Sequence, residues 1–129
     1  MSRKSKGINA ERELIHAFWK KGWAALRAAG SGSIKYPCPD VLAGKGARRI
    51  AIECKASADN KKYLTRKEIN ELEEFARIFG AEPWVAVRFD NIKWFFISTS
   101  DLEKTKESNY VSVELAKRRG MLFEELIGE

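Results

Sequence analysis

One hairpin near the middle of the chain restricts the fold more than any other segment. Residues 48–56 carry apolar side chains in alternation, and a shorter run at residues 40–43 precedes them across the glycine-flanked turn 44–46. This arrangement predicts two antiparallel strands. Because successive side chains of a strand point to opposite faces, the hairpin is expected to present two chemically different surfaces.

The remaining segments predict helices and strands around this hairpin. Apolar spacing predicts a first helix at residues 8–21, ended by Gly22, and Thr65 with Glu68 has the capping-box spacing that starts a second helix. Strands are expected at residues 23–28, 83–89 and 93–98, an extended segment at 109–113, a short helix at 121–127, loops at 29–39 and 57–64, and a loose basic arm at 1–6. The order predicts an α/β fold, one mixed central β-sheet flanked by α-helices, in a single domain of 129 residues.

The returning strand of the hairpin carries an acid and an amine on one face. The even-numbered residues of segment 50–54 form its apolar face, so Glu53 and Lys55 lie next to each other on the opposite face. Asp40 begins the partner strand, directly after Pro39, and the hairpin is expected to bring its carboxylate near Glu53. The alternative is that Glu53 and Lys55 form only an exposed ion pair, as such triplets commonly do.

The first helix supplies a third carboxylate. At about 100° per residue, Glu11 falls within the apolar arc of the helix, whereas Glu13 falls on the opposite side. Burial of an unpaired carboxylate is costly, so Glu11 is expected to have a cationic partner or a metal. Arg12 and Arg27 are candidates for a purely structural ion pair, and this alternative stays open.

Three carboxylates and a lysine suit the metal-assisted hydrolysis of a phosphodiester. Mg²⁺ prefers oxygen ligands, and Asp40 and Glu53 can hold it against a phosphate while Lys55 stabilises the developing charge. Such a site needs no histidine, and His16 is the only histidine of the chain. The sequence has no CxxC motif or Cys/His cluster of the kind that binds zinc.

The net charge favours an anionic partner. It is +6, which is typical of proteins that bind nucleic acid or an anionic membrane surface. Membrane binding is less favoured, because no apolar run approaches the length of about 18 residues that a spanning helix needs. No apolar secretory segment follows the basic N-terminus, so a cytoplasmic DNA-binding or RNA-binding protein is expected.

Several short motifs occur in a fixed order along the chain. They are Ala10-Glu11-Arg12-Glu13-Leu14, Leu26-Arg27-Ala28-Ala29-Gly30-Ser31, Pro39-Asp40-Val41-Leu42-Ala43, Ile52-Glu53-Cys54-Lys55, Glu74-Phe75-Ala76-Arg77 and Phe79-Gly80. Together they resemble the archaeal Holliday junction resolvase family, Hjc, within the PD-(D/E)xK nuclease fold. The resemblance implies a restriction-endonuclease-like fold and an endonuclease that resolves four-way DNA junctions by paired nicks, in DNA recombination and repair.

The resemblance also implies which residues act. The positions that match the family's catalytic residues, including a serine in a loop near the cleaved strand, are Glu11, Asp40, Glu53, Lys55 and Ser31. The three carboxylates among them are the expected ligands of Mg²⁺, for which Mn²⁺ can substitute, and no small-molecule cofactor is expected. Arg12 and Arg27 match residues expected to contact DNA.

Further DNA contacts are expected from polar and basic residues near the catalytic hairpin. These are Arg3, Lys4, Lys6, Ser33, Lys35, Lys61, Lys62 and Arg66. Neutralising phosphates in this way would make DNA affinity fall steeply as salt rises. The alternative for any single basic cluster is an ordinary solvated face.

The second helix offers a dimer surface. Its apolar positions cover about half of the circumference, which is wider than one core-facing stripe requires. The resemblance implies a homodimer with Phe75 and Phe79 in the interface, and a twofold dimer would present two equivalent sites to a four-way junction. The alternative is a helix simply buried within the monomer.

Two other functions stay open at this point. The first is a PD-(D/E)xK nuclease that cuts another DNA structure, such as a flap, and the second is a protein that binds branched DNA without cutting it. The intact set of Asp40, Glu53 and Lys55 favours cleavage over binding alone. Sequence pattern does not distinguish a junction from a flap.

Overall fold

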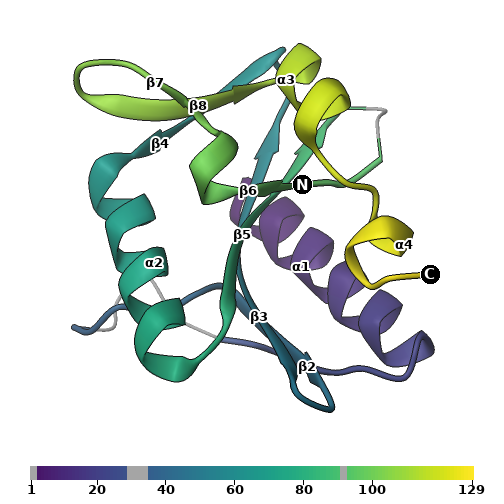
Figure 1. The fold of residues 1–129 in the computed structure, drawn as a ribbon. Coiled ribbons are helices and arrows are strands. Elements are labelled where there is room, and N and C mark those ends of the chain that lie inside the picture. The colour runs from purple at the N-terminus through teal and green to yellow at the C-terminus, as the bar shows by residue number, and fades with distance from the viewer. Residues whose placement is uncertain (1–2, 29–34, 91–92) are drawn as a thin grey trace.

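A five-stranded mixed sheet forms the centre of the computed structural model (Figure 1). The structure describes residues 3–28, 35–90 and 93–129, with residues 3–8 as backbone alone. The strands follow one another across the sheet as β1 (Ala24–Arg27), β2 (Val41–Lys45), β3 (Arg48–Ser57), β5 (Glu82–Phe89) and β6 (Phe95–Ser98). Strands β3 and β5 are parallel, and the other neighbouring pairs are antiparallel. The mixed central sheet expected from the sequence is therefore confirmed.

Strands β2 and β3 form the expected hairpin. Val41 pairs with Ile52 and Lys45 with Arg48. The turn lies one to two residues later than expected, because Gly44 and Lys45 continue strand β2. Gly46 has φ 60°, a left-handed conformation that glycine adopts without steric cost, and this residue closes the turn.

Helices cover both faces of the central sheet (Figure 1). Helix α1 (Arg3–Lys20) and the short helix α4 (Phe123–Leu126) contribute to one hydrophobic cluster, whose fully buried members include Leu14, Phe18, Ile50, Ile52 and Phe96. Helices α2 (Arg66–Phe79) and α3 (Val113–Arg119) contribute to the other, which includes Ala51, Ile69, Leu72, Val85 and Leu115. Among the described residues, no helix combines the length and apolar character that crossing a bilayer would require.

Helix α2 has the ends that the sequence predicts. Thr65 Oγ1 accepts a hydrogen bond from Glu68 N, and a Glu68 carboxylate oxygen accepts one from Thr65 N, both at 3.0 Å. This is the reciprocal capping box. Gly80 follows the helix with φ 85° and donates its N–H to Ala76 O. The start of α2 is therefore fixed to Thr65, the residue that directly precedes it.

The structure contains a second sheet that the sequence analysis did not predict. It consists of β4 (Lys61–Thr65), β8 (Ser108–Ser112) and β7 (Glu103–Lys104), with β8 in the middle. The expectation of a loop at residues 57–64 was wrong for most of this segment. Only Leu64 of strand β4 is buried, and one apolar residue is too weak a pattern to predict a strand whose partner lies more than forty residues away.

The remaining differences concern helices. The loose arm expected at residues 1–6 was wrong for residues 3–6, since α1 begins at Arg3. Lysine and arginine are good helix formers, so a helix can extend beyond its apolar pattern. Helix α3 and a short 3₁₀ helix at Thr99–Asp101 were not predicted, whereas the strand at 109–113 and the short helix at 121–127 were, to within a few residues.

Candidate active site

Asp40, Glu53 and Lys55 belong to the end of the hairpin that lies away from its turn. Ile50 and Ile52 belong to the cluster on the α1 side of the sheet, and Ala51 belongs to the cluster on the α2 side. Side chains alternate along β3, so Glu53 and Lys55 continue the face of Ala51. The expected shared face is confirmed, and it is the face that α2 covers.

Backbone and side-chain hydrogen bonds fix Asp40 against strand β3. Its N–H donates to Ile52 O at 3.0 Å, and its carbonyl oxygen accepts from Ala28 N at 2.9 Å. Its Oδ2 accepts a hydrogen bond from Cys54 N at 2.8 Å. Asp40 also follows a buried residue, Pro39. The carboxylate is therefore held beside Glu53 by contacts on both sides.

Glu53 is in an unfavourable environment for an ionised carboxylate. Burial, then the charge of Asp40 and a side-chain hydrogen bond with Asp40, raise the pKa of Glu53 to about 9. Burial and the charge of Asp40 also raise the pKa of Glu11, against a smaller opposing effect of Arg27. The charge of Asp40 thus disfavours the ionised form of both Glu53 and Glu11, and a proton or a cation beside Asp40 would relieve this repulsion.

Glu11 lies beside Arg27, one of the two partners that the sequence left open. Arg27 Nε is 3.5 Å from Glu11 Oε1, and the Glu11 side chain is 18% exposed. Arg27 Nε is buried and makes no hydrogen bond within the part of the chain that the structure describes. Glu13, expected on the outer side, is 58% exposed and pairs with Arg88 at 2.8 Å. The inference that Glu11 points inward while Glu13 points outward is confirmed.

Lys55 forms an ion pair with Glu68, which the sequence analysis had assigned only to the helix cap. Lys55 Nζ donates a hydrogen bond to Glu68 Oε2. Burial lowers the pKa of Lys55, but this hydrogen bond and the nearby carboxylates outweigh burial and the pKa is raised. Burial likewise raises the pKa of Glu68, but the Lys55 and Thr65 hydrogen bonds outweigh it and the pKa is lowered. Both groups are therefore charged at neutral pH.

The donor set can accept a hard divalent cation at one place. Asp40 and Glu53 offer carboxylate oxygens, the ligands that Mg²⁺ prefers, and a bound cation would offset the charge of Asp40 that disfavours ionisation of Glu53. The described residues contain no group of three or more His, Cys, Asp or Glu side chains arranged to hold a metal ion. Asp40 and Glu53 thus provide two of the three expected ligands, whereas Glu11 forms an ion pair with Arg27.

Comparison with known proteins relates the whole chain to one family. A family model described as the archaeal Holliday junction resolvase (Hjc) matches residues 2–129. The chain belongs to this family. Among the relatives of the resolvase family, the crossover junction endodeoxyribonuclease Hjc of Archaeoglobus fulgidus is 43% identical over 98% of this chain and 98% of its own length. The enzyme of the same name from Methanocaldococcus jannaschii is 37% identical over 95% of this chain and 87% of its own length.

A solved structure in the Hjc family has the same fold. It is the structure of Archaeoglobus fulgidus Hjc, described as a Holliday junction resolvase from an archaeal hyperthermophile. The two structures match with a TM-score of 0.88 at 36% sequence identity, over 96% of this chain and 97% of that chain. The fold that the motifs implied is therefore confirmed.

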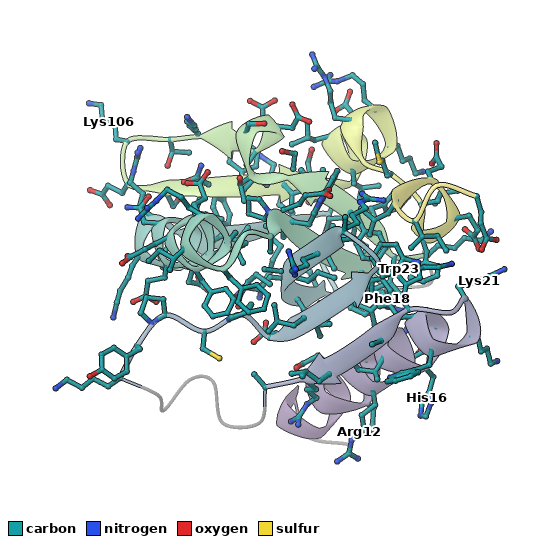
Figure 2. All side chains as sticks on the ribbon, turned by 60° about the horizontal axis from the view of Figure 1, so that its bottom comes forward. Arg12, His16, Phe18, Lys21, Trp23 and Lys106 are labelled. Atoms are coloured by element: carbon teal, nitrogen blue, oxygen red, sulfur yellow. The ribbon has the colours of Figure 1, made fainter. Side chains whose placement is uncertain are left out.

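The residues expected to bind DNA have different environments in this structure. Arg12 is exposed and points away from the protein body (Figure 2). Lys35 and Lys61 are exposed and Lys62 is partly buried. Arg66 donates hydrogen bonds to the carbonyl oxygens of Thr105 and Lys106, so it also holds the turn between β7 and β8. Ser31, Ser33 and the side chains of Arg3, Lys4 and Lys6 lie outside the described residues.

The expected dimer surface is partly apolar and open. Phe75 and Phe79 stack with their ring centroids 5.3 Å apart. Phe79 is 49% exposed and Leu26 is 55% exposed. Both line an open apolar groove of about 330 Å³, together with Trp19, Ala24, Ala25, Leu42, Ala43, Gly44 and Arg49. Phe79, at the end of helix α2, is therefore half exposed in a single chain, whereas Ile69, Leu72 and Ala76 of the same helix are buried.

Proposed function

We propose that this chain is an Mg²⁺-dependent endonuclease that resolves four-way DNA junctions. The observation that carries the proposal is the Asp40–Glu53 carboxyl pair beside Lys55, at the end of the hairpin, in a chain of the Hjc family. The single nuclease domain is taken to comprise residues 1–129 and to act in the cytoplasm. Names of relatives such as crossover junction endodeoxyribonuclease support the choice of substrate.

The carboxylates would hold the cation and Lys55 would act on the phosphate. Asp40 and Glu53 are the ligands that we assign, with Glu11 as a third if Arg27 releases it on DNA binding. A bound Mg²⁺ supplies polarisation of the phosphoryl oxygen and acidification of a water. The Lys55 ammonium stabilises the charge that develops on the phosphate and orients the attacking water. Mn²⁺ is expected to substitute for Mg²⁺.

The DNA would lie across the face that carries these groups. We assign phosphate contacts to Arg3, Lys4, Lys6, Arg12, Arg27, Ser33, Lys35, Lys61, Lys62 and Arg66, and a role beside the cleaved strand to Ser31. The net charge of +6 supports a surface that attracts the DNA backbone. These contacts orient the duplex, whereas recognition of the branch depends on the relative placement of two active sites.

Resolution of a junction requires two active sites, and we propose a homodimer. A junction is cut in two strands of like polarity, and a twofold axis relates two equivalent sites in the same way. The groove lined by Leu26, Leu42 and Phe79 supports a dimer, because apolar side chains that are half exposed in one chain can be buried between two. Phe75 and Phe79 are the residues that we assign to the interface.

Cleavage of a synthetic four-way junction in Mg²⁺ tests the function. Asp40→Asn and Glu53→Gln preserve side-chain size and are expected to abolish cleavage without loss of junction binding. Glu107→Gln is the matched control, since Glu107 is an exposed carboxylate on the turn between β7 and β8, and it should cut like the wild type.

Parallel reactions on a flap and on linear duplex distinguish the substrate. Paired nicks in the junction alone are the expected result. Faster cutting of the flap would contradict the junction as substrate but leave a nuclease. Tight junction binding without cleavage in Mg²⁺ or Mn²⁺ would contradict the catalytic assignment and leave a protein that binds branched DNA.

A further inference from the structure

Glu68 connects the start of helix α2 with the active site. It is the third residue of helix α2, and its carboxylate closes the capping box with Thr65. Oε1 accepts the hydrogen bond from Thr65 N at 3.0 Å. Oε2 takes no part in the cap and accepts instead from Lys55 Nζ. One carboxylate thus joins the backbone of the helix start to the ammonium of the proposed catalytic lysine.

The cap gives this carboxylate a fixed position. A glutamate on an exposed helix face has three rotatable side-chain bonds, and an ion pair formed there contributes little to stability. Glu68 differs because the hydrogen bond to Thr65 N already restrains its carboxylate, and the side chain is 31% exposed while that of Lys55 is 21% exposed. The Lys55 ammonium is flexible by itself, so a restrained acceptor determines where it points.

The charges around Lys55 indicate why its ammonium needs an acceptor outside the carboxylate pair. Glu53 and Asp40 are the other carboxylates that attract its ammonium. Once these two carboxylates are neutralised by a cation, their attraction for Lys55 is lost and the cation repels the ammonium. Glu68 lies on helix α2 and outside the Asp40–Glu53 pair, so its attraction persists.

We infer that Glu68 is a positioning residue that holds the Lys55 ammonium at the edge of the active site while the carboxylate pair is occupied. The inference rests on the proposed function, because it assigns Glu68 a role in the reaction that Lys55 assists. A purely structural role is the competing explanation, since the cap alone stabilises the start of α2. The two explanations require different oxygens of the same carboxylate, which allows variants to separate them.

Glu68→Gln removes the charge of the carboxylate and preserves the cap of helix α2. Glutamine is also a capping-box residue, and its amide oxygen can accept from Thr65 N, but it carries no charge for Lys55. We expect single-turnover junction cleavage to slow by about 10- to 100-fold, with the dissociation constant for the junction unchanged. Thr65→Ala is the matched control, because it removes the hydrogen bond to Glu68 N and leaves the Glu68–Lys55 pair. This control should melt roughly 4 °C lower and cut at the wild-type rate.

A second measurement does not depend on cleavage. The ¹⁵N-labelled ammonium of Lys55 can be observed by NMR in the metal-free protein and assigned by its loss in Lys55→Met. Hydrogen bonding to Glu68 slows proton exchange, so the signal is expected in the wild type and in Thr65→Ala, and it should broaden or disappear in Glu68→Gln.

The outcomes separate the two proposals. Wild-type cleavage by Glu68→Gln, or an unchanged Lys55 signal in that variant, would overturn the positioning role and leave the nuclease intact. A wild-type protein that cuts no junction, with a Lys55 signal that still depends on Glu68, would refute the proposed function and retain the positioning of Lys55.

Discussion

Replacement of Glu53 by glutamine should remove an unusual pH dependence of stability. Burial and Asp40 raise the pKa of Glu53 to about 9 in the folded protein, whereas in the unfolded chain the pKa returns to about 4.5. Between these two values the folded protein binds one proton more than the unfolded chain. The resulting stabilisation is fully present below about pH 4.5 and is lost progressively as the pH rises towards 9.

The size of the effect follows from proton linkage. One extra bound proton changes the free energy of unfolding by about 1.4 kcal/mol for each pH unit. From pH 5.5 to pH 7.5 the metal-free wild type should therefore lose about 3 kcal/mol of stability through this group. Glu53→Gln is neutral at every pH and does not lose it, so the variant should gain stability relative to the wild type as the pH rises.

Urea denaturation in the presence of a chelator measures this difference. The free energies of unfolding of wild type, Glu53→Gln and the control Glu107→Gln are compared at pH 5.5, 6.5 and 7.5. Titrating groups remote from Glu53 cancel between the proteins, because they are shared. Parallel pH profiles for wild type and Glu53→Gln would refute the shared-proton interpretation of the Asp40–Glu53 pair, as would a control that behaves like Glu53→Gln.

Two further predictions concern DNA binding and assembly. Junction affinity should fall by about 10³-fold or more between 50 and 200 mM salt if several phosphates are contacted, and a fluorescence titration with little salt dependence would argue against the assigned basic surface. Replacing both Phe75 and Phe79 by aspartate should convert a dimer into monomers, because Phe79 lines the apolar groove, Phe75 stacks on it, and charges there would oppose burial between two chains. Light scattering measures the mass of the variant. Tyr63→Asp is the control, at an exposed aromatic residue on the second sheet. An unchanged mass of the double variant would exclude this surface as the interface.

The active-site hairpin could be predicted because its signals are local. Alternation along residues 48–56 determined which face Glu53 and Lys55 share, and the structure has the same arrangement. The capping box at Thr65 could also be predicted, since both partners lie within one helical turn. Glu11 was distinguished from Glu13 by helical periodicity alone, and their exposures differ as expected.

Other features depend on contacts that no local pattern encodes. Strand β4 is paired with β8, which lies far along the chain, and only one of its side chains is buried. The sequence presented Arg12 and Arg27 as equal partners for Glu11, and only the packing of β1 beside α1 selects Arg27. The link between Lys55 and Glu68 likewise requires the relative position of a strand and a helix, although the spacing that identified the cap was already visible.

The close spacing along the chain of the two hairpin strands has a consequence for the order of folding. The Asp40 carboxylate and the Cys54 amide that binds it are 14 positions apart, and the turn at Gly46 closes the loop between them. Loops of this length close in less than a microsecond and hairpins form within microseconds. The parallel pairing of β3 with β5, such as Glu53 beside Val85, has to wait for the intervening helix. During synthesis on the ribosome, the chain can thus bring Asp40 and Glu53 together before strand β5 is available to complete the sheet.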